Sequence, residues 1–163
     1  MMAKRDEIAD LLGIISPLET SIKKHEGFRK KSYLDSLGNP TVGWGHLLSS
    51  DTPAGIEYPE LVLEEFFRQD VDAAIEDFGR LPLSTKSRKQ LLPAQQEVLI
   101  EMIFNMGLPK VKRFKKMLGA IERGDTETAA KEMMKSDWAK QVGGRARTLQ
   151  KKFMGKENDK NKR

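Results

Sequence analysis

A long amphipathic stretch between Pro59 and Gly79 constrains the fold most. Its apolar side chains recur at helical spacing, so they fall on one broad face. These residues are Leu61, Leu63, Phe66, Phe67, Val71, Ala74, Ile75 and Phe78. A helix of this length spans roughly 30 Å, at about 1.5 Å per residue. The stretch is therefore long enough to connect two lobes of one domain.

The segment before this helix carries the signals of a β-hairpin. Gly38 and Asn39 form a dipeptide that favours a tight turn. Residues 31–35 and 41–44, which flank this turn, are therefore expected to pair as antiparallel strands. The sequence thus predicts a small hairpin lobe ahead of the long helix.

Helices are predicted on both sides of these elements. Before the hairpin, apolar spacing predicts a short helix, a bend at Pro17 and a second helix over about 18–28. Beyond a basic loop around 84–89 the pattern is helical throughout. The candidate helices cover 93–106, 109–123, 126–138 and 144–154.

The predicted fold class is α+β and mainly helical, with a small antiparallel hairpin lobe and a larger helical lobe joined by the long helix. We expect residues 1–163 to form a single domain, the usual size for a chain of this length. Its expected parts are a helical extension (1–21), the hairpin lobe (22–58), the connecting helix (59–80), the helical lobe (81–154) and a basic tail (155–163).

Composition excludes several classes of protein. The chain has no cysteine, which rules out disulfides and thiolate metal sites, and its two histidines, His25 and His46, are too few for a zinc site. We therefore expect no metal and no cofactor. No apolar run approaches the roughly 20 residues of a membrane span, and no signal peptide is evident. A net charge of +5 favours an anionic partner, either nucleic acid, a membrane surface or a cell-wall polymer.

Three residues around the hairpin indicate a chemistry. Glu26 ends an apolar helical run, Asp35 lies on the hairpin, and Thr41 follows across the turn. Two carboxylates facing each other across a cleft are what glycosidic-bond hydrolysis requires. Each residue has an ordinary explanation when taken singly; a surface pair of Glu26 with Lys30, for example, contributes about 0.3–0.5 kcal/mol. Together they favour a glycan-cleaving enzyme.

The spacing of these residues resembles the T-even phage lysozymes, which belong to glycoside hydrolase family 24. Eight residues separate Glu26 from Asp35, five separate Asp35 from Thr41, and the sequence Val-Gly-Trp-Gly-His-Leu-Leu follows Thr41. The resemblance extends over about 22–153. It is reinforced by the segments 69–74, 104–107 and 136–138, and by an arginine at position 145.

The resemblance implies a lysozyme-like fold and a muramidase, or endolysin, that hydrolyses the β-1,4 bond between N-acetylmuramic acid and N-acetylglucosamine in peptidoglycan, with inversion. It implies that Glu26 is the general acid and that Asp35 and Thr41 position the attacking water. It also implies that Leu47 and Phe104 line the substrate cleft.

Supporting roles follow from the same resemblance. His46 after the hairpin and Asp70 on the long helix are expected to form an ion pair. Asn105, Trp138 and Arg145 are expected to support the site, with Arg145 beside the catalytic glutamate.

An arginine beside the catalytic acid creates a tension. An adjacent cation lowers a carboxyl pKa, whereas a general acid benefits from a raised one. Burial must therefore offset the charge of Arg145 if Glu26 is to stay protonated. A departure from the family concerns Met117 and Glu132, which occupy cleft positions where the T-even proteins carry small polar residues.

The expected partner is bacterial peptidoglycan, bound by a monomer without stable membrane insertion. We expect synthesis in the host bacterial cytoplasm and action on the wall, after holin-type release if the chain is a free lysis enzyme rather than a virion component. The lysine-rich runs 110–116 and 151–163 are expected to be solvated faces that attract the anionic wall. Nucleic-acid binding is the main alternative, although no groove-reading motif supports it. A wall-binding relative without catalysis is a third possibility, disfavoured by the intact Glu26 and Asp35.

Overall fold

The computed structural model describes residues 12–155, and side chains from Pro17 onward. The predicted extension and basic tail lie partly outside these residues. The described elements are α2 (Leu12–Glu26), β1 (Arg29–Leu34), β2 (Pro40–Gly43), β3 (His46–Leu47), α3 (Glu60–Phe78), α4 (Thr85–Gln90), α5 (Pro93–Met106), α6 (Leu108–Lys112), α7 (Lys115–Glu122), α8 (Thr126–Met134), α9 (Asp137–Val142) and α10 (Gly144–Met154). The predicted fold class, α+β and mainly helical, is confirmed.

The small lobe is an antiparallel sheet with strand order β1-β2-β3. Tyr33 pairs with Thr41 across the predicted hairpin, and Thr41 in turn pairs with Leu47 of β3. Gly38 occupies the turn with a φ of 83°, a conformation that glycine adopts without steric cost. The short strand β3 was not predicted, because two residues carry no detectable alternation. Its pairing with β2 brings His46 and Leu47 beside the hairpin.

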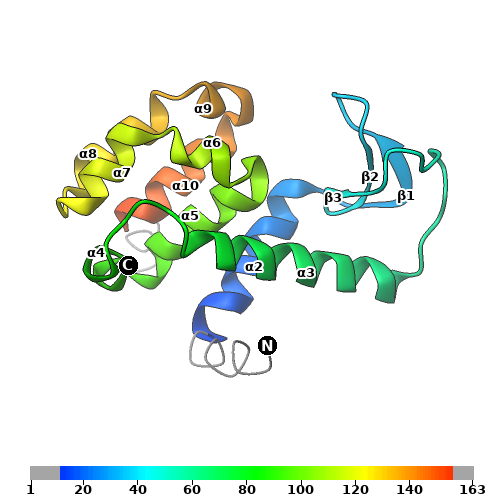
Figure 1. Ribbon diagram of the computed structural model, residues 1–163, viewed down its shortest axis with the longest axis horizontal. Coiled ribbons are helices and arrows are strands. Elements are labelled where there is room, and N and C mark those ends of the chain that lie inside the picture. The colour runs from blue at the N-terminus through cyan, green and yellow to red at the C-terminus, as the bar shows by residue number, and fades with distance from the viewer. Residues whose placement is uncertain (1–11, 156–163) are drawn as a thin grey trace, which may run out of the picture.

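Helix α3 connects the sheet to the helical lobe, as its length predicts (Figure 1). One side of it is buried, through Leu63, Phe67, Val71 and Ala74. Leu61, in the first turn, is 85% exposed and so lies outside the buried face, contrary to the prediction. Helix α3 packs against α5 of the helical lobe and against β2 and β3 of the sheet, so it contacts both lobes.

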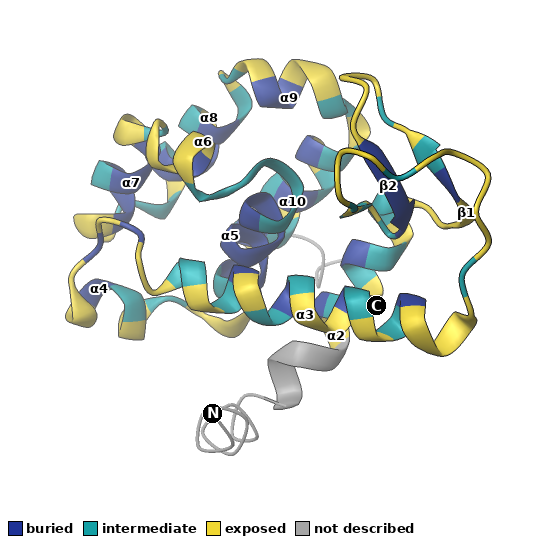
Figure 2. Cartoon of the chain, turned by 45° about the vertical axis from the view of Figure 1, so that its right-hand side comes forward, coloured by how far each residue is buried: buried dark blue, intermediate teal, exposed yellow. Residues whose placement is uncertain are grey.

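Helix α5 is the centre of the core. Figure 2 shows it coloured as buried along much of its length, and its apolar residues from Val98 to Ile103 are at most 5% exposed. It packs against α2, α3, α6 and α10. Leu18 and Ile22 of α2 join the same core. Helix α2 is therefore anchored in the helical lobe while its last residue, Glu26, reaches the hairpin.

Two predicted helices, 93–106 and 144–154, coincide with α5 and α10. The other two are divided. The predicted helix 109–123 separates into α6 and α7 around Phe114, and 126–138 separates into α8 and α9. The second break occurs because Ser136 caps α9, accepting a hydrogen bond from Ala139 N–H at 3.1 Å.

Two further predictions were wrong. The segment 84–89 is not a loop, because the Ser84 side chain accepts a hydrogen bond from Ser87 N–H at 3.1 Å and caps helix α4. The predicted division into two helices at Pro17 is also not observed, since one helix, α2, runs through this residue. Pro17 lies near the start of α2, where it removes one helical hydrogen bond without ending the helix. Over residues 12–155, no helix is long and apolar enough to cross a membrane.

Candidate active site

Glu26 is the last residue of α2, and Gly27 with a φ of 72° turns the chain from this helix into β1. Its side chain is 16% exposed. Arg145 Nη2 of α10 lies 3.0 Å from Glu26 Oε1, and Asn105 Nδ2 of α5 donates to the same oxygen at 3.4 Å. Helices α2, α5 and α10 thus converge on one carboxyl group. The predicted contact between Arg145 and Glu26 is confirmed.

Burial raises the pKa of Glu26, and this effect exceeds the opposing effect of the Arg145 charge. Arg145 Nη2 makes no well-aligned hydrogen bond among the described residues, although it is close to Glu26 Oε1. We therefore attribute its effect on Glu26 to the proximity of its charge. The expectation that burial must offset this cation is confirmed.

Asp35 lies at the start of the hairpin turn, and backbone N–H groups of the turn donate hydrogen bonds to its carboxylate. One oxygen, Oδ1, accepts hydrogen bonds from Leu37 N–H at 2.9 Å and from Asn39 N–H at 2.8 Å. These bonds to the charged form, led by that of Asn39, lower the pKa of Asp35. Asp35 and Glu26 therefore have pKa values displaced in opposite directions, the pattern that separates an acid from a base.

Thr41 lies on the opposite strand, and its hydroxyl donates to the Asn39 carbonyl at 2.9 Å. Asn39 thus bonds to both residues: its N–H group donates to Asp35, and its carbonyl accepts from Thr41. Thr41 is 4% exposed, so its side chain is held firmly at the base of the turn. Neither Asp35 nor Thr41 hydrogen bonds to Glu26 in the part of the chain that the structure describes.

The loop between β2 and β3 brings the sheet to Glu26. A Cβ atom added to Gly45 would lie 3.5 Å from Glu26 Oε2, and Gly45 has a φ of 79°. Trp44 packs on Phe67 of α3 with ring centroids 5.2 Å apart, and Phe67 packs on Phe104 of α5 at 5.8 Å. This aromatic row fixes the loop against both helices, so strand β2 leads directly from Thr41 to the neighbourhood of Glu26.

A pocket of about 250 Å³ lies next to this loop. Both residues predicted to bind substrate, Leu47 and Phe104, line it together with Gly45. Leu47 is 62% exposed, so its side chain is accessible at the mouth of this pocket. Gly45 lines the pocket, and its backbone passes close enough to Glu26 that an added Cβ would meet the carboxyl group, so the pocket adjoins this largely buried group.

The predicted contact between His46 and Asp70 is confirmed. His46 Nδ1 lies 2.9 Å from Asp70 Oδ2, and the two side chains are 20% and 32% exposed. The His46 ring also stacks on Phe66 of α3, with ring centroids 4.0 Å apart and an interplanar angle of 11°. These contacts hold β3 against α3 at the edge of the pocket.

Trp138 and Asn105 support Glu26 through one hydrogen bond. The Trp138 indole N–H donates to Asn105 Oδ1 at 2.7 Å. Because this bond occupies the oxygen of the amide, the nitrogen of Asn105 is turned toward Glu26. The two residues thus form a hydrogen-bonded chain that ends at Glu26, with Trp138 itself buried in the core.

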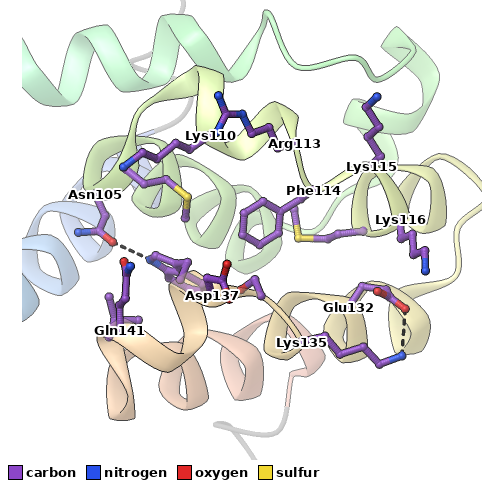
Figure 3. Close-up of a pocket in the computed structure, with 15 residues that line it drawn as sticks. Asn105, Lys110, Arg113, Phe114, Lys115, Lys116, Glu132, Lys135, Asp137 and Gln141 are labelled. Carbon is purple, nitrogen blue, oxygen red and sulfur yellow. Dashed lines mark hydrogen bonds and ion pairs between the residues drawn. The ribbon is translucent and has the colours of Figure 1, made fainter.

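A second hollow of about 730 Å³ lies between α6, α7, α8 and α9 (Figure 3). Met117 and Glu132, the two cleft positions expected to depart from the family, line it, as do Asn105 and Trp138. Lysine and arginine side chains from three segments surround it: Lys110, Arg113, Lys115, Lys116 and Lys135. Among these, Lys135 pairs with Glu132 at 3.2 Å. The hollow is thus a basic extension of the surface around Asn105.

One important residue was missed. Glu101 of α5 is 1% exposed, and Arg145 Nε donates to its Oε2 at 3.0 Å. The only sequence signal is a pair of glutamates, Glu97 and Glu101, four residues apart inside an apolar helix. Within residues 12–155, no group of three or more histidine, aspartate or glutamate side chains is placed to hold a metal ion.

The sequence model of the phage lysozyme family matches residues 23–153. The chain belongs to the phage lysozyme family. The match covers every residue predicted for the site, from Glu26 to Arg145. Family membership supports a lysozyme, or muramidase, function for the chain, and the two carboxyl groups with oppositely displaced pKa values agree with an enzyme of that class.

Individual relatives in this family come from different sources. The chain is 30% identical over 145 residues to the pre-baseplate central spike protein Gp5 of Enterobacteria phage T4, covering 77% of this chain but 25% of that protein. It is 27% identical over 154 residues to a probable T4-type lysozyme of Dictyostelium discoideum, covering 82% of this chain and 91% of that protein. It is 33% identical over 94 residues to the endolysin of Salmonella phage P22, covering 54% and 59%.

Proposed function

We propose that this member of the family is a muramidase that hydrolyses the β-1,4 bond between N-acetylmuramic acid and N-acetylglucosamine in bacterial peptidoglycan. The observation that carries the proposal is the position of Glu26, a buried carboxyl group with a raised pKa beside the pocket lined by Leu47 and Phe104. A carboxyl group in such surroundings retains a proton that it can give to the leaving glycosidic oxygen.

Asp35 and Thr41 are proposed to position the attacking water. The lowered pKa keeps Asp35 ionised, so its carboxylate can accept a proton from water. The Thr41 hydroxyl donates a hydrogen bond to the Asn39 carbonyl, which leaves the lone pairs of its oxygen to accept a hydrogen bond from that water. Water activated on the face opposite the leaving group attacks with inversion, and the product is first released as the α-anomer.

Leu47 and Phe104 are proposed to contact the sugar rings at the pocket. Both are apolar and accessible at the pocket, which Leu47 lines from β3 and Phe104 from α5. The basic residues around the second hollow are proposed to attract the anionic wall. No cofactor takes part in this scheme, because Glu26 and Asp35 supply the acid and the base.

The setting of the reaction is part of the proposal. We infer a monomeric enzyme made in the cytoplasm of a bacterial host, which reaches the wall after release and makes no stable insertion into the membrane. The relatives include both an endolysin and a baseplate spike protein, so a free lysis enzyme and a virion component are both represented in the family. A free lysis enzyme would need a holin-type partner for release.

The test is product analysis on purified peptidoglycan with a chelator present. New reducing ends should appear, and mass spectrometry after borohydride reduction should find reduced muramic acid at the chain ends. Proton NMR of the first product should show the α-anomer. Release of free peptides, reduced glucosamine at the ends, or a requirement for added metal would overturn the proposed reaction.

A further inference from the structure

Glu101 is a buried carboxylate with three polar contacts. The Ser21 hydroxyl donates a hydrogen bond to Oε1 at 2.5 Å, while His25 Nδ1 lies 2.6 Å and Arg145 Nε 3.0 Å from Oε2. The side chain is 1% exposed. Burying a carboxylate is costly unless it is paired and hydrogen bonded. These three contacts from α2 and α10 meet that requirement at the centre of the core.

Arg145 lies between Glu101 and Glu26. Its Nε donates to Glu101 Oε2 in a well-formed hydrogen bond, whereas its Nη2 is near Glu26 Oε1 without such a bond. The guanidinium group is itself only 9% exposed, so little water screens its charge. One buried cation is thus divided between two buried carboxyl groups and is aligned with Glu101.

This arrangement affects Glu26, the proposed general acid. We propose that Glu101 is a positioning residue that aligns Arg145 toward itself and so prevents the cation from pairing fully with Glu26. The proposal rests on the proposed function, in which Glu26 must remain protonated to act. Glu26 faces Arg145 from α10 and Asn105 and Glu101 from α5, and its neighbour on α2, His25, contacts Glu101. The charge of Glu101 also raises the pKa of Glu26 directly.

The test is the pH dependence of hydrolysis in Glu101→Gln. Without the negative charge at position 101, Arg145 should act on Glu26 alone and move the alkaline limb of the rate profile to lower pH. At a pH just above the wild-type midpoint, the rate should fall on the order of tenfold, because a close cation lowers a carboxyl pKa by about 1–3 units. An alkaline limb that stays in place in the folded variant would overturn the proposal.

Glu97→Gln is the matched control. Glu97 lies one turn earlier on α5, is also buried, and pairs with Lys152 rather than Arg145. This variant should lose stability in thermal unfolding, as Glu101→Gln should, but it should leave the alkaline limb in place. Equal shifts of the limb in both variants would reduce Glu101 to a structural role and overturn the proposal.

A direct measurement separates this inference from the proposed function. Carbon NMR titration of the Glu26 carboxyl group reports its pKa without any substrate. Glu101→Gln should lower that pKa, and Glu101→Asp, which keeps the charge but moves it back from Arg145, should lower it less. If Glu101→Gln does not fold, the aspartate variant decides, and an unchanged Glu26 pKa overturns the inference. Failure of the wild-type protein to cleave peptidoglycan would instead overturn the proposed function.

Discussion

His46 Nδ1 lies 2.9 Å from Asp70 Oδ2, so a residue of the short strand β3 is joined to the middle of α3. Breaking a buried pair costs roughly 3–5 kcal/mol, and an exposed pair contributes about 0–1 kcal/mol. With side chains 20% and 32% exposed, this pair lies between these limits. We expect His46→Asn and Asp70→Asn to destabilise non-additively, with a coupling energy of about 1 kcal/mol in a double-mutant cycle.

The pair of Arg68 and Glu65 provides the control for that cycle. It lies on the same helix, at 3.1 Å, with side chains half exposed. Its coupling energy should be about 0.3–0.5 kcal/mol. If His46 and Asp70 give additive losses in free energy of unfolding, the contact contributes nothing to the attachment of β3.

Replacement of the acid should abolish turnover. Glu26→Gln keeps the size of the side chain but has no acid proton to donate. Positioned acid–base catalysis contributes roughly 10²–10⁴-fold, so we expect a loss of that size in the rate of reducing-end formation. Circular dichroism should show an intact fold. A residual rate within a few-fold of wild type would remove Glu26 from the role of acid.

Thr41 should act through its hydroxyl group. The hydroxyl donates to the Asn39 carbonyl, and its oxygen is proposed to hold the attacking water. Thr41→Ser keeps this group and should retain most of the activity, whereas Thr41→Ala should lose more. Steady-state rates on peptidoglycan check this, with thermal unfolding of both variants as the control. Equal rates would leave Thr41 with a packing role alone.

The pH profile of hydrolysis should be bell-shaped, with Glu26 setting the alkaline limb and Asp35 the acidic limb. Burial raises the pKa of Glu26 above the ordinary 4.5, and the acid works only when protonated, so activity should persist above pH 4.5 and fall as pH rises through the raised value. Backbone hydrogen bonds lower the pKa of Asp35 below 3.8, so the acidic limb should lie below pH 3.8. Initial rates at constant ionic strength measure both limbs. An alkaline limb at or below pH 4.5 would contradict the assignment of Glu26.

Salt should weaken action on whole cell wall. The net charge is +5. Salt screening limits the range over which exposed charges interact to about 8 Å at physiological ionic strength. Activity on intact peptidoglycan should therefore fall as salt rises, whereas cleavage of a short uncharged chitin-type oligosaccharide should change much less. The same salt series with duplex and single-stranded DNA tests the nucleic-acid alternative. Tight, sequence-selective DNA binding with peptidoglycan left uncut would favour that alternative over the enzyme.

The sequence predicts best those elements that are bounded by proline or glycine, because these residues have strong backbone preferences. Pro93 and Gly107 bound α5, and Gly38 forms the hairpin turn, so their positions follow from backbone preferences alone. The break around Phe114 has no glycine or proline to mark it. Packing decides it, because Phe114 turns out of the helical line and contacts Trp138 edge-on, with ring centroids 6.4 Å apart.

The site shows the same difference between what local sequence indicates and what tertiary packing decides. Glu26, Asp35, Thr41 and Leu47 lie within a short stretch, so their spacing was readable from the sequence, although their catalytic and binding roles stay predictions. The alignment of Arg145 by Glu101 could not be read in this way, because the contacts of Glu101 come from residues 44 to 80 positions away. Periodicity shows that α5 is buried, but it does not show which charges meet inside. The sequence by itself determined the long helix, the hairpin turn, the ends of α5 and the spacing of the residues around the hairpin. Only the packing of α2, α5 and α10 decided the environment of Glu26, because a pKa depends on neighbours in space.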